Sequence, residues 1–357
     1  MLINVLLVVI AVLLFGLIIF IHELGHFVTA KLSGICVHEF AIGMGPTLFH
    51  FGKGETKYSL RLLPIGGFCA MEGEDEHSDD SHAFCNKPVW KRILVVIMGA
   101  VMNILLGIVL MMIILGQRTA FSSTTIAEFE SNAATQSAGL QVKDQFYSIN
   151  NYRTYTDGDI SFALATANPN SVDVQVVRDG KKLTFNHIKL NSVKNNGKNI
   201  VSLDFKVYRI DKNPGTLITK SLSDTVSTVR MVWASLAGLV SGKFGFNDIA
   251  GPVGTATVIS QAASAGLKVN FWAAFSNILY VMMIITVNLG VVNLLPFPAL
   301  DGGRLIFLII EGIRRKPINP KYEGWVNAAG FALLMVLMVV VTFSDILRLI
   351  TGKGLGA

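Results

Sequence analysis

The sequence has little charge. Only 15% of its 357 residues are Asp, Glu, Lys or Arg, whereas 52% are hydrophobic. A soluble domain carries about 25% charged residues, and these are mixed among the apolar ones. The apolar residues here form long blocks instead. The composition therefore excludes an ordinary soluble domain and predicts a membrane protein.

The hydrophobic blocks predict four membrane segments, since one helical span needs about 20 apolar residues. Three blocks are nearly continuous: Leu2–Ile21, Ile93–Leu115, and a third that begins near Val326 and centres on residues 331–343. Another block, Ile278–Ile310, contains prolines, asparagines and an aspartate. That span is expected to be irregular.

Basic residues are missing from the chain before Lys31. A cleaved signal peptide has a positive start and a small-residue cleavage site, so this absence favours a retained membrane segment. Lys and Arg collect in two later stretches, and basic residues mark the cytosolic side. These residues are Lys31, Lys53, Lys57, Arg61, Lys87, Lys91 and Arg92, then Arg314, Arg315, Lys316 and Lys321.

The charge bias predicts one topology. Residues 31–92 and 312–323 lie in the cytosol, while residues 118–270 and both termini lie outside. The net charge of +6 is explained by this bias, so no nucleic-acid partner is expected. The lipid bilayer is the surrounding partner.

Cysteine is also scarce. Cys36, Cys69 and Cys85 are odd in number and lack C-x-x-C spacing, so the sequence predicts free thiols. Internal repeats and low-complexity tracts are absent as well.

Local patterns place smaller elements between the spans. Residues 37–71 alternate in places and predict short β-hairpins, with a turn at residues 64–67. Strands are expected at Gln145–Ile149 and Val172–Val177, the second ending at an Asp179-Gly180 hairpin turn. A short helix is expected at residues 161–167, and an amphipathic helix near the membrane surface at residues 218–239.

The first apolar block ends in His22-Glu23-Leu24-Gly25-His26. Residues four apart share one helix face, so both imidazoles can reach one metal ion, and the intervening Glu23 can activate a bound water. Helix capping at the interface is the plainer alternative. It does not explain ionisable groups within an apolar span, where they are costly and usually functional.

A catalytic zinc site needs a third protein ligand. The best candidate is Asp301, which follows Asn293-Leu-Leu-Pro296-Phe-Pro298 in the interrupted block. Two prolines break the helix there, and a carboxylate at membrane depth needs a cationic partner. A kink between two short helices is the simpler alternative, but a kink does not require an aspartate.

These motifs give the chain a resemblance to the bacterial site-2 proteases, the RseP-like enzymes of regulated intramembrane proteolysis. Three features carry it: His22-Glu-Leu-Gly-His26, the Asn293-to-Gly302 stretch, and a segment between them similar to a PDZ domain. The PDZ similarity rests on Ala138-Gly139-Leu140, Lys143-Asp144 and Ser148-Ile149-Asn150, with Lys143 where glycine is usual. Gly251-Pro252-Val253-Gly254 matches too.

The resemblance implies a polytopic α-helical membrane protein with about four transmembrane segments, membrane-associated β-hairpins and one inserted extracytoplasmic PDZ-like α/β domain. It implies a first transmembrane half at 1–117, the PDZ-like domain at 118–212, a linker helix at 213–270 and a second transmembrane half at 271–357.

The resemblance also implies residue roles. His22, His26 and Asp301 would hold Zn²⁺, Glu23 would be general base and then proton donor, and Asn293 with Gly66, Gly67 and Phe68 would bind substrate. Substrates would be single-pass membrane proteins, such as anti-sigma factors or remnant signal peptides, in the bacterial cytoplasmic membrane.

Two other functions remain open from the residues themselves. Histidine and aspartate at membrane depth also occur in metal transporters, although few further acids lie in the spans to form a relay. A non-catalytic scaffold presenting the PDZ-like domain is the other alternative, and the intact Glu23 argues against it. Whether that domain binds a ligand or filters substrates by size is also open.

Overall fold

A computed structural model describes residues 2–52, 54–74, 76–195, 198–245 and 248–351. The chain divides into two compact units. The first contains Met1–Leu110 and Thr255–Val340, and the second contains Met111–Gly254 and Val341–Ala357.

Four helices of the described chain are long and apolar enough to cross a membrane, in agreement with the four predicted spans. They are α1 (Leu2–Leu32), α2 (Val89–Gly116), α7 (Phe271–Asn293) and α9 (Pro320–Thr351). The irregular block divides as expected. Helix α7 ends at Asn293, and the shorter α8 (Asp301–Arg314) begins after a non-helical connection.

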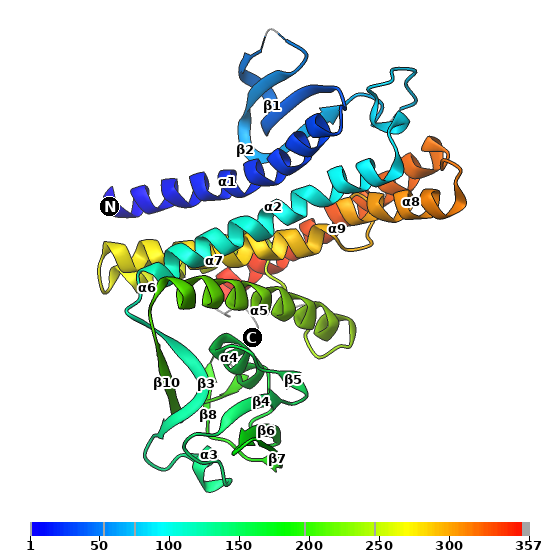
Figure 1. The fold of residues 1–357 in the computed structure, drawn as a ribbon. Helices are drawn as coiled ribbons and strands as arrows, with labels where there is room; N and C mark the ends of the chain where they lie inside the picture. The colour runs from blue at the N-terminus through cyan, green and yellow to red at the C-terminus, as the bar shows by residue number, and fades with distance from the viewer. Residues whose placement is uncertain (1, 53, 75, 196–197, 246–247, 352–357) are drawn as a thin grey trace. The chain divides into compact units, whose positions relative to one another are not determined.

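Two long strands, β1 (Val37–Phe51) and β2 (Lys57–Met71), wrap around each other after α1 (Figure 1). The first half of β1 pairs on both sides with β2: Ala41 faces Phe68 in one direction and Ser59 in the other. The second half of β1 pairs only with the first half of β2. Residues 67–71 of β2 therefore form an outer edge of this wrapped sheet.

The turn expected at residues 64–67 is not a chain reversal between two strands. These residues lie inside β2, which bends there and crosses to the other side of β1. Gly66 has a φ of +79°, and Gly43 in β1 has a φ of +86°, a region that side-chain-bearing residues avoid. Glycine at both places lets each strand bend without ending.

The second unit contains an antiparallel sheet in the order β10-β3-β4-β6-β7, with β5 beside β4. Strands β8 and β9 form a separate antiparallel pair, and we call the whole region from β3 to β10, including helices α3 and α4, the sheet domain. Its members are β3 (Ala120–Phe129), α3 (Ala134–Ser137), β4 (Gln145–Ile149), β5 (Tyr152–Arg153), α4 (Asp157–Ala165), β6 (Val172–Arg178), β7 (Lys181–Ile188), β8 (Ser192–Asn195), β9 (Lys198–Val201) and β10 (Phe205–Asp211). A single apolar core, which includes Ile126, Phe146 and Val174, lies between the sheet and α4.

Local sequence signals account for much of this domain. Asp179 and Gly180 both have positive φ, the conformation of the two-residue hairpin turn that the pair predicts. Lys143 adopts a φ of +75°, so the turn that usually carries glycine is kept with lysine in it. The adjacent Asp144 is fully buried and paired with Arg178, with 2.7 Å between Oδ1 and Nε.

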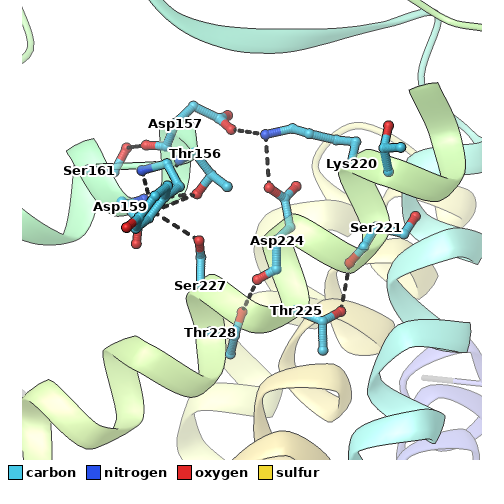
Figure 2. Close-up of polar contacts among 12 residues, drawn as sticks. Thr156, Asp157, Asp159, Ser161, Lys220, Ser221, Asp224, Thr225, Ser227 and Thr228 are labelled. Carbon is cyan, nitrogen blue, oxygen red and sulfur yellow. Dashed lines mark hydrogen bonds and ion pairs between the residues drawn. The ribbon is translucent and has the colours of Figure 1, made fainter. Parts of the chain in front are cut away.

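Helix α5 (Pro214–Val240) is joined to α4 by buried and partly buried polar contacts, which Figure 2 shows. Lys220 lies between Asp157 and Asp224, with Nζ 2.5 Å and 2.8 Å from their carboxylate oxygens. The fully buried Asp159 accepts a hydrogen bond from Ser227 at 2.9 Å.

The pKa of Lys220 is raised. Burial alone would lower it, but the neighbouring Asp224 and Asp157 carboxylates outweigh that effect. Lys220 is therefore charged at neutral pH, and its ion pair with Asp157 of α4 helps hold α5 against the sheet domain.

The remaining helices are η1 (Phe84–Asn86) and α6 (Pro252–Leu267). The glycines of Gly251-Pro-Val-Gly254 bring backbone amides to Asp345 of α9. Their N–H groups donate to Asp345 Oδ2 at 3.0 Å and 2.7 Å. A carboxylate at a helix N-terminus is favoured by the helix dipole, which gives this motif a structural role.

Candidate metal centre

His22 and His26 lie one turn apart on α1 and are both buried. Their Nε2 atoms are 3.3 Å apart, so the two rings converge on one point. The i, i+4 spacing places them on one helix face, as expected from the sequence.

Asp301 reaches the same point from α8. The chain between Asn293 and Asp301 folds back against the start of α8, where Gly302 and Gly303 follow the aspartate. A Cβ on Gly302 would lie 2.1 Å from the carbonyl oxygen of Leu295, and one on Gly303 would lie 2.4 Å from that of Phe297. Only glycines permit this close return, which brings the Asp301 carboxylate to the histidines.

The three side chains have the spacing of ligands around one zinc ion. Asp301 Oδ2 is 3.3 Å from His22 Nε2 and 3.5 Å from His26 Nε2. Tetrahedral zinc with bonds of about 2.05 Å places its ligand atoms about 3.3–3.4 Å apart. Within the described chain, buried Asp301 Oδ2 receives no hydrogen bond of good geometry. A metal ion would satisfy that oxygen, and the residues fit it.

One backbone carbonyl and two asparagine side chains contact the ring nitrogens of the two histidines. His26 Nδ1 is 2.8 Å from the carbonyl oxygen of Val95 on α2, and His22 Nδ1 is 3.1 Å from Nδ2 of Asn103 on the same helix. Asn293, at the end of α7, has its Nδ2 3.2 Å from His22 Nε2. The amide expected to engage substrate therefore lies beside the three-residue cluster.

Glu23 and the outer edge of the wrapped sheet lie together. A Cβ on Gly67 would lie 3.0 Å from Glu23 Cγ, so the β2 backbone passes directly against this side chain. Gly66 and Phe68 flank that contact in the same strand. The structure thus brings the candidate base and the three candidate substrate-binding residues of β2 to one place.

Gly99 on α2 makes room for the two imidazoles. A Cβ there would lie 2.3 Å from His26 Nε2 and 2.9 Å from His22 Cε1. The apolar sequence of this span does not distinguish Gly99 from its other glycines. Asn103, in contrast, is the one polar side chain within Ile93–Leu115, a pattern that indicates a role inside the protein.

Replacing Gly99 with alanine is expected to push both rings away from their common point and to weaken metal binding by about tenfold or more, as misplaced ligands do. Zinc content after dialysis against a chelator measures this. Gly116→Ala on the same helix is the matched control, because nothing lies within 4 Å of its added Cβ. Equal zinc retention in both variants would contradict the close contact.

The remaining histidines and the cysteines lie elsewhere. His22, His26 and Asp301 are the one group of potential metal ligands found among the described residues. The three cysteines are free thiols, as predicted. Burial raises the pKa of Cys69 to about 12, with nearby carboxylates adding to the shift, so this thiol stays protonated.

The chain is similar to a known protein family and to several bacterial proteins. The profile of peptidase family M50 matches residues 10–337. The chain is 38% identical to a predicted zinc metalloprotease of Clostridium acetobutylicum, over 95% of this chain and 97% of the relative. A predicted zinc metalloprotease of Clostridium perfringens is 39% identical, over 95% of this chain and 98% of the relative. Both relatives are named as zinc metalloproteases, in agreement with the Zn²⁺ cofactor expected from the sequence.

A third relative is the regulator of sigma-W protease RasP of Bacillus subtilis, 32% identical over 95% of this chain and 97% of RasP. That alignment covers 423 positions, more than the 357 residues here, so RasP contains segments with no counterpart in this chain. The family match covers most of the chain and includes both parts of the candidate metal centre. The chain therefore belongs to peptidase family M50.

Proposed function

We propose that the protein is a zinc-dependent intramembrane endopeptidase, in which His22, His26 and Asp301 hold the metal. The convergence of these three side chains, at the spacing of tetrahedral zinc ligands, is the observation that carries the proposal. The position of His22 and His26 within an apolar helix supports cleavage at membrane depth. The substrates are single-pass membrane proteins, cut within or next to their transmembrane segment.

Zinc bound there supplies a Lewis acid that activates water and polarises the scissile carbonyl. A carboxylate oxygen of Glu23 accepts a proton from the attacking water. Glu23 then gives this proton to the leaving amide nitrogen. His26 is oriented by the Val95 carbonyl, which fixes the proton on Nδ1 and leaves Nε2 for the metal. The Asn293 amide, beside His22, is placed to donate to a substrate carbonyl.

The outer edge of β2 supplies the substrate site. A transmembrane helix hides its amides in its own hydrogen bonds, so it must unwind and find new backbone partners before cleavage. Residues 67–71 pair with β1 on one side only, and Gly67 lies against Glu23. A substrate segment added as a strand along Gly66, Gly67 and Phe68 would pass the base.

Exposed apolar side chains on the wrapped sheet support its association with the bilayer. Leu48, Phe49, Phe51 and Leu62 are each more than half exposed. We assign the sheet domain and its flanks (118–212) as an extracytoplasmic PDZ-like domain, with residues 213–270 linking it to the second transmembrane half. Both termini lie outside the bacterial cytoplasmic membrane, and the metal lies toward its cytosolic side.

RasP is named as a regulator of sigma-W, which supports anti-sigma factors as one class of substrate, with remnant signal peptides as another. The test is cleavage of a single-pass model substrate by the purified protein in lipid. We expect a cut within or beside its transmembrane segment, identified by mass spectrometry, that stops on chelation and returns with zinc. A metal transporter or a non-catalytic scaffold would produce no cut.

A further inference from the structure

Asn103 is an amide side chain with no exposed surface in the middle of α2. Its Nδ2 lies 3.1 Å from His22 Nδ1, and its Oδ1 is buried without a hydrogen-bond partner in the described chain. A buried polar atom without a partner costs stability, so this one calls for an explanation.

The chemistry of His22 supplies that explanation. Neutral imidazole carries one proton, and a ring that binds a metal through Nε2 must carry it on Nδ1. Nδ1–H then needs an acceptor, but Asn103 as it lies presents a donor to it. A half-turn about the Cβ–Cγ bond exchanges Nδ2 with Oδ1 and provides the acceptor at the same position.

We propose that Asn103 is a positioning residue for His22, whose amide oxygen accepts the Nδ1 proton and so keeps Nε2 free for zinc. The proposal rests on the zinc site proposed above. Helix α2 then orients both histidines: His26 through the backbone carbonyl of Val95, and His22 through the Asn103 side chain.

Asn103 is itself fixed in place. Its backbone carbonyl oxygen accepts a hydrogen bond from Thr286 Oγ1 on α7 at 3.1 Å, and Thr286 has no exposed surface. Helices α2 and α7 are thereby joined at the residue that faces His22. In metal sites, the group that hydrogen-bonds the ring nitrogen not bound to the metal fixes the orientation and the tautomer of the histidine.

The test compares two variants of similar size. Asn103→Leu removes the acceptor, whereas Asn103→Asp keeps an oxygen there. Zinc dissociation constants are measured by chelator competition on the purified proteins. We expect Asn103→Leu to bind zinc about 10- to 100-fold more weakly. Asn103→Asp should lie closer to the wild type, and the visible spectrum of the cobalt-substituted protein should change only in Asn103→Leu.

A purely structural role predicts something different, because both variants would then lose thermal stability and zinc affinity to the same degree. That result, or wild-type zinc affinity in Asn103→Leu, would overturn the proposal. If Asn103→Leu does not fold, ¹⁵N spectra of histidine-labelled, zinc-loaded wild type decide the question. His22 should be protonated at Nδ1, and protonation at Nε2 overturns the role. If the wild type binds no zinc at all, the proposed function itself fails.

Discussion

Replacing Asp301 with asparagine is expected to weaken zinc binding by about tenfold or more. Loss of a residue that binds the metal directly should lower the affinity at least as much as loss of a residue that only hydrogen-bonds a ligand. The substitution keeps the size of the side chain but removes the negative charge beside His22 and His26. Proteolysis should fall with the zinc content and return in part when excess zinc is added. Zinc per protein and cleavage rate are measured on the same preparation.

The control for this variant is Asp79→Asn, an aspartate whose side chain is fully exposed to solvent. It should keep both zinc and activity. Undiminished zinc content in Asp301→Asn would remove the aspartate from the ligand set. The close packing of residues 295–297 against Gly302 and Gly303 would then need another explanation.

Replacing Glu23 with glutamine is expected to separate metal binding from catalysis. Glutamine keeps the size of the side chain but cannot accept the proton of the attacking water, and a general base contributes about 10²- to 10⁴-fold to the rate. Cleavage of the model substrate should fall by that factor, while zinc content stays at the wild-type level. The rate is followed by gel and mass spectrometry.

Glu128→Gln, an exposed glutamate of β3, serves as the matched control. Cleavage by Glu23→Gln at the wild-type rate would contradict the assignment of the base. Loss of zinc would instead make Glu23 a ligand. The inactive variant can also hold substrates in native membranes, which is the direct route to their identity.

The sequence predicts those strands and turns that are determined by residues close to one another in the chain. The Gln145–Ile149 strand and the Asp179-Gly180 turn follow from alternation and turn chemistry, and both occur as expected. Helix α4 begins earlier than predicted, at Asp157, because Thr156 and Asp159 form a capping box. Helix α5 likewise begins at Pro214 after the Asn213 cap, a start that apolar spacing alone does not reveal.

The wrapped sheet could not be predicted in the same way. Pairing Ala41 with both Ser59 and Phe68 depends on how two long strands bend around each other, which no local pattern of residues encodes. Proline and glycine at residues 64–67 do indicate a change of direction. They do not say whether the chain reverses or bends and continues.

In the candidate site, some residues can also be predicted from local patterns, whereas others depend on how the helices pack. Spacing on one helix predicts the His22–His26 pair, and a broken span with an acid predicts Asp301. Gly99 and Asn103 matter only because α2 lies against α1 at that level, and their roles follow from helix packing that the sequence does not show.

In the proposed metal centre, three residues from two distant segments of the chain hold one zinc ion. X-ray absorption at the zinc edge of the purified wild-type protein tests it most directly. We expect two imidazole nitrogens and oxygen ligands at about 2.0–2.2 Å, with no sulfur. A sulfur neighbour at about 2.3 Å, or fewer than two imidazoles, would contradict it.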